Sequence, residues 1–188
     1  AGAGVFAWAD SLPGLMLGRS LIGERASDVS AVIDWLIAEH ETLAIGREQI
    51  HIMGHSSGGS VALMTAALDT RISAILASGC IGFIRDTIAR RRDDQGQNVI
   101  PGILNWLEMA DIVGLVAPRP FATVAGTDDH IWPAAGAVAV VMQAKPVYEQ
   151  LGAVERLCCI AEPGGHRFRP AVSWQALSAA LSGEATCG

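Results

Sequence analysis

The stretch IHIMGHSSGGS, residues 50–60, decides which fold and chemistry the sequence predicts. A short apolar run leads into GHSSG at residues 54–58, which fits the spacing G-x-S-x-G. In such a turn from a strand to a helix, the serine is held in a strained conformation with its hydroxyl exposed above a sheet. Glycines two positions before and after the serine leave no side chains to collide in the turn. Only Ser56 has both glycines, so Ser56 is the candidate nucleophile and the backbone N–H of Ser57 is a candidate oxyanion donor.

The segments around this turn alternate between strand and helix patterns. Short apolar runs predict strands at residues 49–53, 72–78, 120–126 and 155–161. Helical spacing predicts helices at residues 27–40, 60–68 and 134–151, and a last helix that starts at Pro170 and stops at Gly183. The first helix is expected to bury one apolar face, formed by Val29, Val32, Ile33, Leu36 and Ile37. This order predicts an α/β fold, a mostly parallel sheet with helices on both faces, in a single domain over residues 1–188.

A serine nucleophile needs a base, and the base needs an acid that orients it. Of the five histidines, His166 is the best candidate base, because it lies in a glycine-rich loop directly after the last predicted strand. Asp128 and Asp129 directly follow the strand at residues 120–126, so both are candidates for the acid. Side chains that follow the carboxyl ends of parallel strands meet at one edge of the sheet. The sequence therefore predicts one site with a serine, an aspartate and a histidine, in the chain order expected for α/β-hydrolases.

With these motifs, the sequence resembles the α/β-hydrolase superfamily, and within it bacterial esterases similar to acetyl xylan esterases and dienelactone hydrolases. The matching segments are GRSLIGERASDVSAVIDWL, IHIMGHSSGG, DIVGLVAPRPFATVAGTDDHIWP and YEQLGAVERLCCIAEPGGHRF. The family pattern of the acid loop is G-x-x-D with a proline four residues after the aspartate, which fits Gly126, Asp129 and Pro133. The resemblance therefore selects Asp129 as the acid and leaves Asp128 as the alternative.

The resemblance also implies where a substrate binds. The segment 80–110 resembles the part of the family that lines the pocket, with apolar side chains at Phe83, Ile84, Ile100, Leu104 and Trp106. Trp106, Trp132 beside the acid and His55 beside the nucleophile are the candidates for substrate contact. For each tryptophan, packing in the core is the alternative. The family's N-terminal strands, which carry the second oxyanion donor, are expected to be missing, with GVFAWAD as the remainder of that region.

Together these features predict a serine esterase that hydrolyses small or short-acyl carboxylic esters. Ser56 attacks and forms an acyl-enzyme, His166 acts as the base and Asp129 orients it. An amidase or peptidase with the same triad is one alternative. A hydrolase-like module that has an impaired active site is the other.

Composition excludes several other classes of protein. The formal net charge of -6 argues against a nucleic-acid-binding surface, and no apolar stretch reaches the roughly 18 residues of a membrane span. The four cysteines show neither CxxC nor ligand spacing with histidine, so we expect no cofactor and no metal, with residues 128–130 as a weak alternative metal site. We expect a cytoplasmic protein whose partner is a small-molecule ester and which forms a homodimer across an uncovered sheet edge.

Overall fold

A computed structural model gives the fold of the chain and describes residues 13–44, 46, 49–87 and 97–185. Four strands form a parallel sheet in the order β1-β2-β3-β4, namely β1 (Ile50–His55), β2 (Ile72–Ser78), β3 (Phe121–Gly126) and β4 (Leu157–Glu162). The helices are α2 (Leu21–Ala38), α3 (His40–Leu43), α4 (Ser57–Leu68), α5 (Met109–Gly114), α6 (Ala134–Gln150) and α7 (Pro170–Ser182), with short 3-10 helices η1 (Ile103–Asn105) and η2 (Val154–Arg156). Each connection between neighbouring strands contains a helix, as parallel pairing requires.

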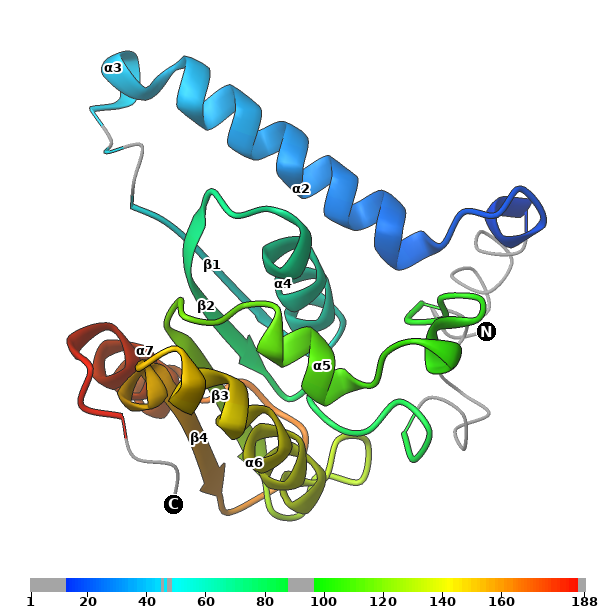
Figure 1. The fold of residues 1–188 in the computed structure, drawn as a ribbon, viewed down its shortest axis with the longest axis vertical. Coiled ribbons are helices and arrows are strands. Elements are labelled where there is room, and N and C mark those ends of the chain that lie inside the picture. Colours follow the sequence, from blue (N-terminus) through cyan, green and yellow to red (C-terminus); the bar gives the residue numbers. More distant parts are fainter. Residues whose placement is uncertain (1–12, 45, 47–48, 88–96, 186–188) are drawn as a thin grey trace.

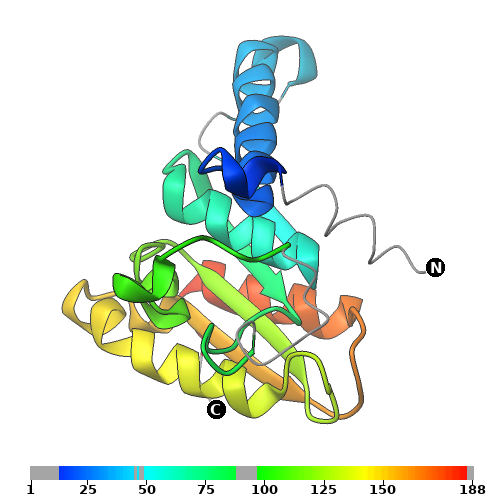
Figure 2. The same ribbon diagram turned by 90° about the vertical axis from the view of Figure 1, so that its right-hand side faces the viewer.

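Helices cover both faces of the sheet (Figure 1). On one face, α4, α5 and α6 enclose the larger core, in which Leu63, Phe121 and Tyr148 are fully buried. On the other face, α7 packs through Leu177 against a smaller core formed by the alternate residues of the strands. Helix α2 lies on the outer side of α4 and packs against it (Figure 2). The central strands β2 and β3 are therefore buried on both sides, which explains their continuous apolar runs, whereas His51 and Met53 of β1 are exposed.

Several element boundaries differ from the predicted ones. Helix α2 begins at Leu21 rather than at residue 27, because the hydroxyl of Ser20 accepts a hydrogen bond from the Gly23 N–H (3.2 Å) and caps the helix there. Helix α4 begins at Ser57 rather than at residue 60, so the helix includes glycines that the apolar pattern does not mark. The prediction of a wide apolar face on α2 is wrong for Val32, which is 55% exposed. Because α2 packs on a single helix, it buries only a narrow strip.

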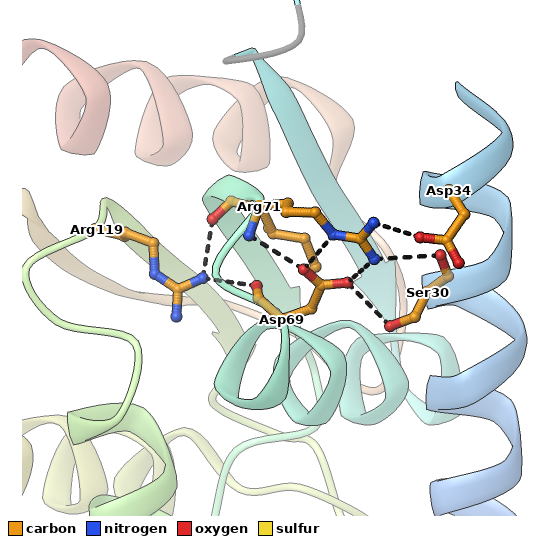
Figure 3. Close-up of polar contacts among 6 residues, drawn as sticks. Ser30, Asp34, Asp69, Arg71 and Arg119 are labelled. Carbon is orange, nitrogen blue, oxygen red and sulfur yellow. Dashed lines mark hydrogen bonds and ion pairs between the residues drawn. The ribbon is translucent and has the colours of Figure 1, made fainter. Parts of the chain in front are cut away.

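A polar network ties α2 to the loop between α4 and β2 (Figure 3). The carboxylate of Asp69, directly after α4, accepts hydrogen bonds from Nη2 of Arg71 (2.6 Å) and from the hydroxyl of Ser30 on α2 (3.0 Å). Arg71 also forms an ion pair with Asp34 on α2. The guanidinium of Arg119 donates to three backbone carbonyl oxygens at the end of α4 and the start of β2, those of Ala66, Asp69 and Ile72. The network lies at the amino ends of the strands, away from the end where chemistry is expected.

Three further observations concern predicted absences. Within the described ranges, no helix combines the length and the apolar character that crossing a bilayer requires. Cys80, Cys158 and Cys159 are buried and form no disulfide. The part of the chain that the structure describes contains no group of three or more His, Cys, Asp or Glu side chains suited to a metal ion, and residues 128–130 form no such group.

Candidate active site

Ser56 lies in the sharp turn between β1 and α4. Its backbone has φ 55° and ψ -126°, and a positive φ is uncommon for a residue with a side chain. The Ser56 N–H donates to the carbonyl oxygen of Ser78 at the end of β2 (2.8 Å), and its own carbonyl accepts from the Ser60 N–H (3.0 Å). Both the sheet and the helix therefore hold the residue, which is how such strained conformations persist at functional sites.

Two glycines, Gly54 and Gly59, leave the space that this turn needs. The sequence predicted this role for Gly54 but not for Gly59. A Cβ on Gly54 would lie 2.2 Å from the carbonyl oxygen of Gly58, and a Cβ on Gly59 would lie 2.6 Å from Sγ of Cys80. A Cβ on Gly58, in contrast, would meet no atom within 4 Å. The steric reason given for the G-x-S-x-G spacing therefore holds for Gly54 and is wrong for Gly58. Gly59 is required instead, because α4 packs closely on the end of β2.

His166 links the nucleophile to the acid. It lies in the loop after β4, and its Nε2 is 2.8 Å from Oγ of Ser56 while its Nδ1 is 2.7 Å from Oδ2 of Asp129. A buried carboxylate accepts hydrogen bonds, so the hydrogen lies on Nδ1 and leaves the lone pair of Nε2 free to accept from the Ser56 hydroxyl. The side chain of His166 is 18% exposed. The imidazole is thus oriented as a general base for Ser56.

Asp129 follows β3 and is 3% exposed. Its Oδ1 accepts from the backbone N–H groups of Ile131 (2.8 Å) and Trp132 (2.9 Å), and its Oδ2 accepts from His166. Burial would raise the pKa of Asp129, but the hydrogen bonds from Trp132, His166 and Ile131 outweigh it and lower the pKa below the ordinary value. The lowered pKa favours the ionised form of Asp129, which is the form that could stabilise a cation on His166.

Asp128 has a different role, because it is exposed and the carboxylate that Nδ1 of His166 contacts is that of Asp129. Its carboxylate accepts from the Gly164 N–H (3.0 Å), and its own N–H donates to the Gly164 carbonyl (3.1 Å). Of the two candidate acids, the structure brings Asp129 to the base. Asp128 instead joins the acid loop to the loop that carries the base.

Arg169 shapes the loop of His166, and the sequence analysis missed it. Its guanidinium donates to the carbonyl oxygens of Pro163 (3.1 Å), Gly165 (3.0 Å) and Arg167 (3.0 Å). A Cβ on Gly126, at the end of β3, would lie 2.2 Å from the Gly164 carbonyl, so the loop passes directly over that glycine. Arg167 and Arg169 flank Phe168 in the sequence, and only the tertiary structure distinguishes their roles.

Ser57 is fixed by a second residue that the sequence analysis missed, Arg25 on α2. Nη1 of Arg25 donates to Oγ of Ser57 (3.1 Å), and the Ser57 hydroxyl donates to Oε1 of Gln97 (2.9 Å). Nη1 of Arg25 also reaches Oε1 of Gln97 (3.3 Å). Because α4 begins at Ser57, the backbone N–H of this residue lacks an acceptor within the helix. The network thus holds the predicted oxyanion donor in place.

The predicted substrate-contact residues lie in three different environments. His55 is partly buried against His166, and its Nδ1 lies 3.2 Å from Oγ of Ser78. Trp132 is 3% exposed, so its ring packs inside the protein, whereas Trp106 is 85% exposed. Substrate contact remains a prediction for all three residues.

The segment that was expected to line the pocket forms a cavity of about 270 Å³. It is lined mainly by apolar side chains and by the backbone around η1, including the predicted Ile84, Ile100 and Leu104. Ser56, Asp129 and His166 are not among its lining residues. A second cavity, of about 480 Å³, lies between α2, β1 and the start of α4, and both Arg25 and Ser57 line it.

The fold and the strand-turn-helix site define this chain as a member of the α/β-hydrolase superfamily, as the sequence predicted. A model of the family BD-FAE matches residues 19–138, and the chain belongs to this family. The matched range contains Ser56 and Asp129 and ends before His166.

Three known proteins are similar to this chain in sequence or in fold. The Bacillus subtilis (strain 168) protein named "Putative hydrolase YtaP" is 26% identical over 161 residues, which cover 84% of this chain and 52% of that protein. The glucuronoyl esterase from Sporotrichum thermophile has a TM-score of 0.69 at 14% identity, over 90% of this chain and 54% of its own. The glucuronoyl esterase from Solibacter usitatus has a TM-score of 0.66 at 18% identity, over 84% of this chain and 47% of its own. The chain thus spans about half the length of the curated relative that it matches.

Proposed function

We propose that this chain carries the catalytic centre of a carboxylic ester hydrolase that acts on small or short-acyl esters. The observation that carries the proposal is the unbroken line of hydrogen bonds from Oγ of Ser56 through His166 to Asp129. Each partner is positioned by its own strand end, and Ser56 lies in a strained turn at the start of a helix. This combination of nucleophile, base and acid is the general arrangement for acyl transfer through a serine.

In the proposed mechanism, Nε2 of His166 takes the proton of the Ser56 hydroxyl while Oγ attacks the ester carbonyl. The resulting oxyanion accepts a hydrogen bond from the Ser57 N–H at the start of α4. His166 then gives the proton to the leaving alcohol, and water releases the acyl group by the same steps in reverse order. Asp129 stays ionised throughout and stabilises the imidazolium.

The Ser57 N–H has a large share in this mechanism. Removing one donor from an oxyanion hole costs about 3–4 kcal/mol of transition-state stabilisation. The hydrogen bonds from Arg25 and to Gln97 hold the Ser57 side chain and so limit the movement of this residue at the start of α4. We therefore include Arg25 as a positioning residue, which acts on the oxyanion through Ser57.

An ester is favoured over an amide as the substrate by the proteins that share this fold. The glucuronoyl esterases and the methylesterase BT1017, which has a TM-score of 0.65 over 93% of this chain, are named for ester hydrolysis. The assignment to esters is therefore an extension from those proteins, because the triad geometry supports acyl transfer from an ester and from an amide alike.

A serine-directed fluorophosphonate tests the proposed nucleophile. We expect the probe to label the 188-residue chain at Ser56, as located by peptide mass spectrometry, and to leave Ser56→Ala unlabelled. Ser182→Ala is the matched control, because this serine ends α7 and its hydroxyl hydrogen-bonds near Ala179 and Glu184 rather than at the site. Labelling at another residue, or equal labelling of Ser56→Ala, would contradict the mechanism.

Substrate panels test the bond type. We expect the chain to hydrolyse p-nitrophenyl acetate faster than longer acyl esters, and faster than alanine p-nitroanilide. Faster cleavage of the anilide would assign an amidase instead. A chain that is labelled at Ser56 but turns over neither substrate would support a module with an impaired active site.

A further inference from the structure

His55 contacts the candidate base without being part of the triad. Its ring centroid lies 4.8 Å from that of His166, with an angle of 35° between the ring planes. Its centroid also lies 6.0 Å from the ring of Phe168, two residues after the base. At these separations the rings are in the range of aromatic contacts. The residue directly before the nucleophile therefore packs on the residue that must activate the nucleophile.

Ser78 fixes the orientation of the His55 ring. Nδ1 of His55 lies 3.2 Å from Oγ of Ser78, and the Ser78 hydroxyl donates to the carbonyl oxygen of Val124 (3.1 Å). A serine hydroxyl has a single hydrogen, so Oγ of Ser78 accepts from His55. Nδ1 of His55 therefore carries the hydrogen. Ser78 is fully buried, so leaving its hydroxyl or the His55 Nδ1–H without a hydrogen-bond partner would cost more free energy than it would at the surface.

Gly79 limits the His55 ring on another side. A Cβ at this position would lie 2.6 Å from Cε1 of His55 and 3.5 Å from Cε1 of His166. Gly79 also has φ +59°, so a side chain there would be strained as well as crowded. The ring of His55 consequently occupies a slot between the end of β2 and the base, with little room to turn.

The surroundings of His55 favour its neutral form. Burial lowers the pKa of His55 below its ordinary value, and the positive charges of His166 and Arg169 lower it further. Asp129 and the hydrogen bond at Ser78 act in the opposite direction but do not outweigh these effects. A neutral ring adds no positive charge beside His166 when the base takes up the proton of the nucleophile.

We propose that His55 is a positioning residue for His166, whose ring it holds in line between Asp129 and Ser56. The proposal rests on the triad mechanism above and gives the residue at the variable position of the G-x-S turn a function. In this role His55 acts through the base, whereas the sequence predicted that it contacts the substrate. The flat ring of His55 packs against His166, and Ser78 and Gly79 fix the orientation of the His55 ring.

Three variants separate the shape of the ring from other effects of substitution. His55→Ala removes the ring, so we expect the rate of fluorophosphonate labelling at Ser56 to fall roughly 10- to 100-fold, as for other small displacements of reacting groups. His55→Phe restores a flat ring and should recover most of this loss. Ser78→Ala removes the hydrogen-bond partner and should lower the rate in the same direction by a smaller factor. His51→Ala, an exposed histidine on the same strand, is the matched control and should label at the native rate.

A second measurement detects the position of His166 without any reaction. The His166 Nδ1–H that is hydrogen-bonded to Asp129 should give a far-downfield proton resonance, which 15N-edited NMR can assign. We expect this resonance in the native chain and in His55→Phe, and its loss or strong broadening in His55→Ala. Thermal unfolding of each variant shows whether the fold is retained. A folded His55→Ala that keeps both the resonance and the native labelling rate would overturn the proposal.

The remaining outcomes are also decisive. If His55→Phe folds but labels as slowly as His55→Ala, ring shape is not what matters and the proposal fails. If His55→Ala does not fold, an unchanged labelling rate in Ser78→Ala would overturn the proposal. If the native chain is not labelled at all, the proposed function fails, whereas the NMR comparison still decides whether His55 positions His166.

Discussion

Two buried aspartates with a lowered pKa lie at opposite ends of the parallel sheet. Asp69 precedes β2 at the amino ends of the strands, and Asp129 follows β3 at the carboxyl ends. They are 8% and 3% exposed. The pKa of Asp69 falls to about 2, chiefly through the hydrogen bond from Arg71, although burial acts against it. For Asp129, hydrogen bonds likewise overcome the effect of burial.

The partners of the two aspartates differ in chemistry. Arg71 is a permanent cation that neither gains nor loses a proton, so its pair with Asp69 serves to hold α2 against α4 (Figure 3). His166 can gain and lose a proton, and its second nitrogen contacts a hydroxyl in a strained turn. A lowered pKa therefore does not distinguish a structural carboxylate from a catalytic one. The partner of the carboxylate does.

The largest expected effect is that of Asp129→Asn. The asparagine amide would donate to Nδ1 of His166 and force the hydrogen onto Nε2, which could then no longer accept from Ser56. We expect turnover of p-nitrophenyl acetate to fall roughly 10³- to 10⁴-fold, with a similar unfolding midpoint. A fall of less than about tenfold would show that the two aspartates do not differ as argued.

Asp69→Asn should have the opposite profile. It removes the negative charge that pairs with Arg71 and weakens the bond to Ser30, so we expect the free energy of unfolding to fall by about 2 kcal/mol. Urea denaturation measures this loss. Turnover at a temperature where the variant is folded should stay near the native value. Loss of turnover without loss of stability would place Asp69 in the catalytic machinery and break the comparison.

A smaller effect is expected for Arg25→Met, which tests the other polar attachment of α2 to α4. Loss of the bond to Ser57 should lower kcat about tenfold and change KM less, because Arg25 acts on the oxyanion donor rather than on substrate binding. Arg19→Met is the matched control. Arg19 lies just before α2, and its side chain forms an exposed ion pair with Glu24 in the first turn of the helix. An effect on KM alone would instead indicate direct contact with the substrate.

The smallest effect is on acid stability. The pKa of Asp69 is lower in the folded state than in the unfolded chain, so its contribution is complete above about pH 4 and is lost as the pH falls to about 2. Because Arg71 is partly exposed, we expect this contribution to be roughly 1 kcal/mol. Urea denaturation at pH 5 and pH 2.5 should show a larger loss for the native chain than for Asp69→Asn. Equal losses would show that the pair does not titrate in this range.

Much of the site could be predicted, because its positions follow local rules. The spacing of glycines marked Ser56, and the ends of two apolar runs marked His166 and the pair that contains Asp129. The resemblance to the family then selected Asp129, the aspartate that contacts His166. The parallel order of the strands followed from the alternation of strand and helix patterns.

The residues that were missed act through contacts between distant parts of the chain. Arg25 reaches Ser57 from another helix, and nothing in its own segment indicates that contact. Arg169 binds three carbonyl groups whose positions depend on the folded loop. The exposure of Val32 depends on α2 packing against one helix rather than on a sheet. Periodicity predicts which residues share a face, but not how wide the buried part of that face is.

The distance along the chain between Ser56 and His166, 110 residues, has a consequence for folding. The two side chains meet only after β4 has paired with β3 and β3 with β2, and such long-range parallel pairings form late and slowly. A probe that reacts with an activated serine therefore reports on the completed sheet rather than on the nucleophile turn alone. In a refolding experiment, the rate at which labelling at Ser56 recovers would time the docking of the last strand.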